Sequence, residues 1–231
     1  MERARRAFEE QLGVLSEKIL RLGGLVEEAI GRSISALVER DSALARTVIE
    51  HDADVDRLEL EIDRSCMEML ALQQPIAGDL RLVTTAMKIT TDLERMADLA
   101  VNVSERAIEL NLEPQLKPFV DLPRMARRAQ EMVHGALDAF VQRDAEAARK
   151  VIDMDDGLDL TMEQIFRELV SFMLEDPSTV TRALRLTFVA KYFERIGDQA
   201  TNICEQVVYM TEGRVIKHPW IAAEIEGDGT P

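Results

Sequence analysis

Two acidic motifs that match each other at an offset of 100 positions are the part of this sequence best suited to chemistry. Each places a Glu, an Asp and an Asn at intervals of four residues: Glu94, Asp98 and Asn102 in the first, and Glu194, Asp198 and Asn202 in the second. Because four residues make slightly more than one helical turn, these oxygen-bearing side chains share one side of a helix. Apolar residues flank both motifs, so the acids are expected to be partly buried, and a buried carboxylate requires a partner.

A further pair of acids precedes each motif, again at a spacing of four residues. These pairs are Asp52 with Asp56, and Asp155 with Asp159. Asp56 and Glu94 each lie 19 positions from Pro75, which marks a turn. Residues equally distant from a short turn between antiparallel helices lie at the same level. The sequence therefore predicts two carboxylates facing two others, once in each half of the chain.

Three interpretations of these acids remain open on the residues alone. Facing carboxylates repel one another unless they are protonated or bridged by cations, which favours a metal site. Alternatively, Arg95 and Arg195 neutralise the acids, or the acids form a solvated surface. A site made of oxygen donors alone suits Mg²⁺, Mn²⁺, Ca²⁺ or iron and disfavours structural zinc.

The composition favours helices and excludes several classes of partner. With 46% apolar residues, only 7 prolines and a formal charge of −15, the 231-residue chain is suited to an all-α fold and unsuited to binding nucleic acid or anionic lipid directly. No apolar run is long enough to span a membrane, so a cytoplasmic protein that meets a membrane only through partners is expected. Cys66 and Cys204 are then expected to be reduced residues of the core.

Apolar spacing predicts six long helices arranged as a duplicated unit of three. The turn residues Arg40 and Asp41 match Arg143 and Asp144 at an offset of 103. The predicted helices run over 8–38, 42–73, 79–110, 125–140, from the second of these turns to 174, and over 179–211. Short turns make neighbouring helices antiparallel. We therefore expect two elongated three-helix bundles, at 1–112 and 113–214, followed by a flexible tail at 215–231.

The chain resembles the PhoU family of bacterial phosphate-uptake regulators from about Phe8 to Gly213. The resemblance rests on Gln73–Arg81, on Asp92–Asp98, on the Arg143-Asp144 turn and on Tyr192–Glu205. It implies a tandem pair of three-helix bundles with multinuclear metal sites, which hold iron in some members. The candidate metal ligands are Asp52, Asp56, Glu94, Asp98, Asn102, Asp155, Asp159, Glu194, Asp198 and Asn202, with iron, manganese or magnesium as the candidate ions.

The family's function implies that this chain is a regulator and not an enzyme. The resemblance implies negative control of the phosphate-starvation response and of phosphate uptake. It also implies a cytoplasmic adaptor between the phosphate ABC transporter, through its ATPase subunit, and a sensor histidine kinase, and it implies a homodimer. The alternative is a metal-dependent hydrolase or oxidase that uses the same carboxylates to activate water or oxygen. A third interpretation, compatible with the regulatory one, is that the metals are structural and stabilise the bundle by binding only its folded state.

Overall fold

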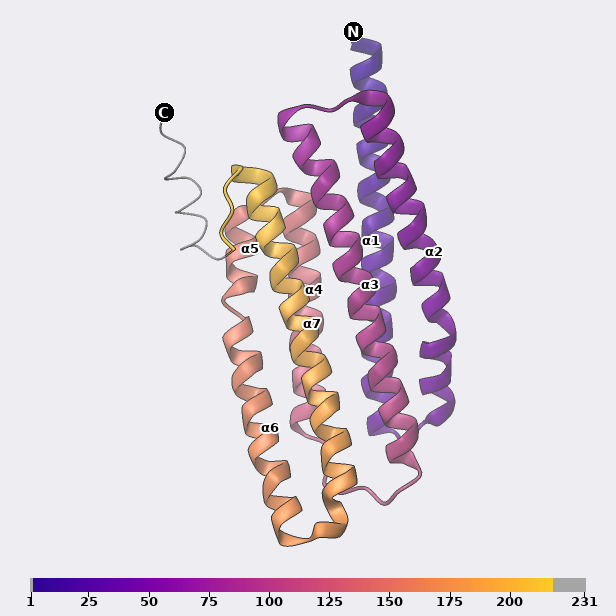
Figure 1. Cartoon of the computed structure of the whole chain (residues 1–231), viewed down its shortest axis with the longest axis vertical. Helices are drawn as coiled ribbons and strands as arrows, with labels where there is room; N and C mark the ends of the chain where they lie inside the picture. The colour runs from indigo at the N-terminus through magenta and orange to yellow at the C-terminus, as the bar shows by residue number, and fades with distance from the viewer. Residues whose placement is uncertain (1, 218–231) are drawn as a thin grey trace.

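The computed structural model describes residues 2–217, which fold into long α-helices and contain no β-strand (Figure 1). This confirms the prediction of an all-α fold. No helix within that range combines the length and the apolar character needed to cross a membrane. The helices are α1 (Glu2–Val38), α2 (Ser42–Gln73), α3 (Ala77–Asn111), α4 (Asp121–Gln142), α5 (Ala145–Ile152), α6 (Asp155–Glu175) and α7 (Val180–Glu212), with a 3₁₀ turn at Pro177–Thr179.

Helices α1, α2 and α3 form the first antiparallel bundle, and its two connections are short. Arg40 adopts a left-handed conformation, and the Asp41 carboxylate accepts hydrogen bonds from two backbone N–H groups at the start of α2. At the other end of α2, the turn predicted at Pro75 is confirmed. The residues in the left-handed conformation there are Gln74 and Ala77, so Gly78 is not the residue that reverses the chain.

The second bundle repeats this plan with one interruption that the sequence does not reveal. Arg143 adopts the left-handed conformation of Arg40, and Asp144 caps the next helix as Asp41 does, by accepting hydrogen bonds from two backbone N–H groups. The single helix predicted from that turn to Leu174 is wrong, because the chain breaks at Asp153 and Met154 between α5 and α6. Both sides of the break have helical spacing, although Asp155, Asp156 and Gly157 directly after it are weak helix formers.

A side chain from another helix holds the break open. Nε and Nη2 of Arg128, in α4, donate to the carbonyl oxygen of Met154 over 3.2 and 3.0 Å. The guanidinium lies against Gly157, where a Cβ atom would come within 2.6 Å of Nη2. The absent side chain of Gly157 therefore makes the space that Arg128 needs to reach the backbone.

The two bundles lie side by side, offset along the long axis, and share one core (Figure 1). Helix α3 packs against α7, and α1 packs against α4, while α2 and the α5–α6 pair flank the molecule (Figure 1). A single contiguous cluster of buried apolar residues runs through both bundles. Polar contacts cross between α3 and α7 near both ends of their contact, from Lys88 Nζ to Gln206 Oε1 over 3.1 Å and from Arg185 Nε to Glu109 Oε2 over 2.8 Å.

The chain after α7 folds back onto the bundle. Gly213 ends the helix in a left-handed conformation with φ of 70°, as the sequence predicts. Of the tail predicted to be flexible, residues 218–231 lie outside the described residues. Ile216 packs against the core, and Lys217 Nζ donates to Asn202 Oδ1 over 2.9 Å.

Both cysteines are reduced residues of the core. Cys66 and Cys204 are fully buried and form no disulfide. Burial raises the pKa of each thiol to about 12, which keeps them protonated at neutral pH. This confirms the prediction made for them.

Candidate functional site

The first acid cluster lies between α2 and α3, where the sequence places it. Asp52 and Glu94 are half-buried, while Asp56 and Asp98 are exposed. Burial, followed by the charges of Asp56 and Asp98, raises the pKa of Asp52 to about 6. Burial also raises the pKa of Glu94, and the charge of Asp98 adds to this effect. Acids on both helices therefore oppose the ionisation of Asp52 and Glu94.

The second acid cluster lies between α6 and α7 and has the same pattern of exposure. Asp155 and Glu194 are half-buried, and Asp159 and Asp198 are exposed. Burial, followed by the charges of Asp198, Asp159 and Glu194, raises the pKa of Asp155 to about 6. Burial and the neighbouring Glu194 also raise the pKa of Asp198. Both predicted sets of facing carboxylates are thus brought together by the fold.

The second cluster contains buried oxygen atoms without hydrogen-bond partners. Oδ1 of Asp155 and Oε2 of Glu194 are both buried and accept no hydrogen bond. The other oxygen of Glu194 pairs with Lys191. Because leaving a buried acceptor unpaired costs about 1–3 kcal/mol, these two atoms favour a ligand that supplies positive charge between α6 and α7.

The arginines of the two motifs form no ion pair with the clusters, and only the charge of Arg195 reaches one of the acids, where it lowers the pKa of Asp198 in part. Arg95 points to the other side of α3, where its Nη1 lies 3.9 Å from Oδ1 of Asp92. Arg195 is exposed and forms no ion pair with another described residue. Apart from the contact between Lys191 and Glu194, the eight acids of the clusters have no ion pair within residues 2–217. The geometry therefore does not support the salt-bridge interpretation.

A glycine allows α6 to approach α7 closely at the second cluster. A Cβ atom on Gly197 would lie 2.4 Å from Cδ2 of Leu158 and 3.1 Å from Oδ1 of Asp155. The matching residue of the first motif is Ala97, which is also buried. The second cluster is consequently the tighter of the two, which agrees with its buried unpaired oxygens.

Glu59 is a further acid of the first cluster and is not among the residues predicted from the sequence. Burial and the charges of Asp63 and Asp56 raise the pKa of Glu59, which lies on the same side of α2. Its position seven residues after Asp52 is the signal that could have identified it.

The two predicted asparagine ligands differ in their surroundings. Asn202 binds Lys217 through its side-chain oxygen, and Asn102 is half-buried in α3.

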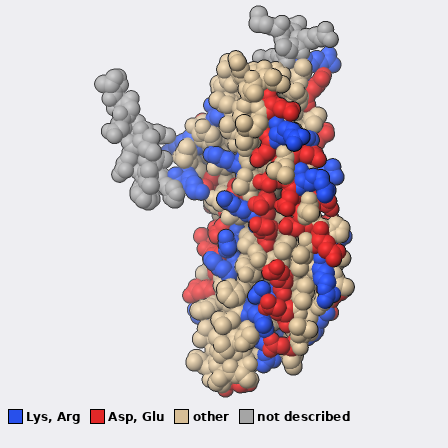
Figure 2. Space-filling view, turned by 45° about the vertical axis from the view of Figure 1, so that its right-hand side comes forward, with Lys and Arg blue, Asp and Glu red and all other residues tan. Residues whose placement is uncertain are grey.

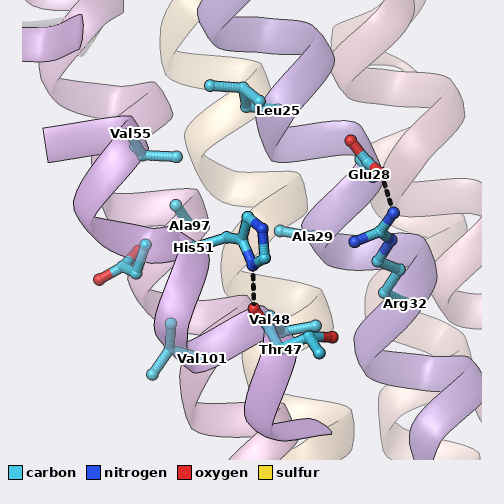
Figure 3. A pocket seen from close by; sticks show the side chains of 11 residues that line it. Leu25, Glu28, Ala29, Arg32, Thr47, Val48, His51, Val55, Ala97 and Val101 are labelled. Atoms are coloured by element: carbon cyan, nitrogen blue, oxygen red, sulfur yellow. Dashed lines mark hydrogen bonds and ion pairs between the residues drawn. The ribbon is translucent and has the colours of Figure 1, made fainter. Parts of the chain in front are cut away.

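The first cluster borders a pocket of about 230 Å³ between α1, α2 and α3 (Figure 3). Arg32 and Glu28 form an ion pair on the α1 side. On the α2 side, Nδ1 of His51 lies 2.7 Å from the carbonyl oxygen of Thr47. A carbonyl only accepts, so Nδ1 carries the hydrogen, and Nε2 of the neutral ring is an acceptor. The His51 ring therefore brings a nitrogen atom with a free lone pair to the pocket that Asp52 also lines. The second repeat has Met154 at the matched position and offers no such nitrogen.

Acidic side chains gather in a band down the middle of the face shown in Figure 2, with basic side chains on both sides. As the side chains lie, no three or more His, Cys, Asp or Glu groups among the described residues are arranged as a metal site. A cation would therefore have to draw the exposed carboxylates of a cluster inward. The donor set, made of carboxylate oxygens on two facing helices, suits hard cations.

Comparison with known proteins identifies the relatives of this chain. The model of the PhoU domain matches it twice, over residues 19–107 and 122–207. The phosphate-specific transport system accessory protein PhoU homolog of Aquifex aeolicus is 43% identical over 212 residues, which cover 92% of this chain and 96% of the relative. The accessory protein PhoU of Escherichia coli is 35% identical over 211 residues, which cover 91% of this chain and 88% of the relative.

Two solved structures share the whole architecture. The crystal structure of PhoU from Pseudomonas aeruginosa has a TM-score of 0.86 and 39% identity, with 89% of this chain and 99% of that chain covered. The structure of the phosphate transport system regulatory protein PhoU from Streptococcus pneumoniae has a TM-score of 0.85 and 26% identity, with 91% and 99% covered. With both domains matched and relatives of more than 30% identity covered almost completely, the chain belongs to the PhoU family.

Proposed function

We propose that this chain is an accessory protein of a phosphate-specific transport system, which restrains phosphate uptake and represses the phosphate-starvation response. The observation that carries the proposal is the similarity to phosphate-specific accessory proteins over both repeats and nearly the full length of the relatives. In this role the protein works in the cytoplasm, as an adaptor between the ATPase subunit of the phosphate transporter and a sensor histidine kinase. The proposal assigns it no catalytic role.

The ends of the two helical hairpins support a role in binding partners. Leu72 and Ile76 are each 78% exposed at the tip between α2 and α3, and Leu174 is 80% exposed at the tip between α6 and α7. The two tips lie at opposite ends of the molecule (Figure 1), and exposed apolar side chains at such a tip favour contacts with other proteins. Long helices also present broad surfaces to which partner helices can bind. A second copy of the chain is a further proposed partner.

Deletion of the gene tests the regulatory proposal. A reporter of phosphate-starvation genes is measured in ample phosphate, in the deletion strain and in the same strain complemented with the intact chain. We expect the reporter to be active in the deletion strain and repressed again on complementation. A reporter that stays repressed without the gene would refute the role as a negative regulator.

We further infer that each acid cluster binds a cation that prefers oxygen ligands, with iron, manganese and magnesium as the candidates. The support is physical: burial, followed by repulsion from neighbouring acids, raises the pKa of Asp52 and of Asp155 to about 6, and Asp155 and Glu194 have buried oxygens without partners. When bound, a cation would supply the positive charge that these oxygens lack. It would also join α2 to α3 and α6 to α7, which stabilises the folded state.

Elemental analysis of the purified chain tests the metal proposal. One variant replaces one helix's acids in each cluster, Glu94, Asp98, Glu194 and Asp198, with Ala. A control variant replaces four exposed acids outside the clusters, Glu50, Glu68, Asp153 and Glu175, with Ala. We expect bound metal in the intact chain and the control and none in the cluster variant. Equal metal content in both variants would refute the assignment, and reporter repression by the folded cluster variant would limit the metal to a structural role.

A further inference from the structure

A second kind of site lies in the groove between α4 and α6. It is distinct from the second acid cluster, which lies between α6 and α7. A pocket of about 350 Å³ opens in this groove. Three arginines of α4, Arg124, Arg127 and Arg128, line it, together with Thr161 and Gln164 of α6. In a chain with a net charge of −15, three guanidinium groups within two helical turns are a local departure from the overall charge.

The first repeat shows that the duplication alone does not produce this pocket. At the offset of 103 that relates the two repeats, Arg127 and Arg128 correspond to Gly24 and Leu25, and Gln164 corresponds to Glu61. In the first repeat the groove is occupied by Lys18, whose Nζ lies 3.9 Å from Glu61 Oε2 and donates to Ser65 Oγ over 3.2 Å. The second repeat therefore has two additional arginines and no counterpart of Glu61, although Asp121 stands where the first repeat has Lys18.

The arginines that line the pocket outnumber its acids, three to two. Asp121 is loosely paired with Arg124, with 3.6 Å between Oδ1 and Nη1. Glu168, farther along the groove, pairs with Lys117 of the connection between the bundles. Glu131 also lines the pocket but is exposed. Arg127 forms no hydrogen bond or ion pair with another described residue.

The backbone around the pocket holds part of it in a fixed position. Arg128 is oriented by its two hydrogen bonds to the carbonyl oxygen of Met154, and it lies in the space left by Gly157. Thr161 is oriented by a hydrogen bond of 2.8 Å from its hydroxyl to the carbonyl oxygen of Gly157. Arg128 has N–H groups beyond the two that bind Met154, and Arg124 and Arg127 are exposed, so the three guanidinium groups together favour a ligand with several acceptor oxygens.

We propose that this pocket binds a phosphoryl group, carried either by inorganic phosphate or by a phosphorylated small molecule. A carboxylate offers two oxygens and one charge, whereas a phosphoryl group offers at least three oxygens and up to two charges, which matches three arginines and the Gln164 amide. The pocket is larger than one phosphate ion requires, so it leaves space for the rest of a phosphorylated molecule. The site is separate from the acid clusters and does not depend on the function proposed above.

Calorimetric titration of the full chain tests this proposal. Inorganic phosphate and adenosine monophosphate are titrated separately into protein treated with chelator, so that cluster-bound metal cannot bind the phosphoryl group. The test variant combines Arg124→Gln with Arg127→Gln and spares Arg128, which supports the backbone. The control variant combines Arg21→Gln, at the position that matches Arg124, with Arg46→Gln, and it removes the same charge from exposed sites. Circular dichroism checks that both variants are as helical as the intact chain.

We expect at least one of the two ligands to bind one-to-one with a Kd of about 1 mM or tighter. Loss of the charged hydrogen bonds should weaken binding about tenfold or more in the test variant and leave the control within about twofold of the intact chain. Binding of phosphate alone would identify the free ion as the ligand, and binding of the nucleotide alone would identify a phosphorylated molecule. Absence of saturable binding for both ligands, or equal weakening in the two variants, would overturn the proposal.

Discussion

Replacing Asp155 with Asn should stabilise the metal-free protein at neutral pH. Burial and four neighbouring acids raise the pKa of Asp155 from its ordinary value of 3.8 to about 6. At about 1.4 kcal/mol for each unit of pKa, this corresponds to about 3 kcal/mol of destabilisation when the carboxylate is charged. Screening by solvent at a half-buried group reduces the expected gain to about 1–2 kcal/mol. Asparagine has nearly the same shape and carries no charge.

The pH dependence distinguishes this electrostatic cause from an effect on packing. Because the folded chain holds the Asp155 proton more tightly than the unfolded chain, its stability falls as the pH rises from about 4 to about 6 and then stays level. The gain from Asp155→Asn should therefore be complete above pH ~6 and disappear near pH ~4.

Urea unfolding in the presence of chelator measures this gain. The free energy of unfolding is compared at both ends of the pH range for the intact chain, for Asp155→Asn and for Asp153→Asn, which removes the same charge from an exposed position two residues earlier. We expect a gain at neutral pH for Asp155→Asn only. A loss of stability in that variant, or a gain that is the same at both pH values, would refute the reasoning.

Three further results follow from the packing and from the clusters. Gly197→Ala should lower the free energy of unfolding by about 1–3 kcal/mol, because its methyl group would collide with Leu158; Gly24→Ala, where a methyl group meets no atom within 4 Å, should be neutral or stabilising, and similar losses for both in urea would contradict this account. Cys66 and Cys204 should resist alkylation in the native protein and react once it is unfolded, as mass spectrometry can follow, because both are buried with a pKa of about 12. Added Mn²⁺ should raise the melting temperature of the chelator-treated protein, but not that of the variant lacking Glu94, Asp98, Glu194 and Asp198; an equal rise in both would place the metal elsewhere.

Local patterns in the chain determine the helices and the repeat. Apolar residues at three- and four-residue spacing specify which side of each helix is buried, and this is sufficient to predict six long antiparallel segments. The turn residues also act locally: Asp41 and Asp144 cap the following helices with their own side chains, so their role is visible from sequence. Spacing from the hairpin turn likewise brings Asp56 to the level of Glu94, because two antiparallel helices keep their register over a short distance.

Tertiary contacts decide what local patterns cannot. The break between α5 and α6 depends on Arg128, which lies 26 residues before the carbonyl group that it holds. The buried oxygens of Asp155 and Glu194 that lack partners depend on the approach of α6 to α7, where Gly197 leaves the space.

Two further features also depend on tertiary contacts. The two bundles share one core, and three arginines of α4 lie opposite Gln164 of α6. Each depends on which helices become neighbours, and this is set by burial of apolar surface summed over the whole molecule. The sequence by itself therefore determined the helices, the duplication and the acids of the candidate site. Only the tertiary structure decided which oxygens of those acids are buried without partners and where a second, cationic pocket forms, because both depend on side chains that are distant in the chain.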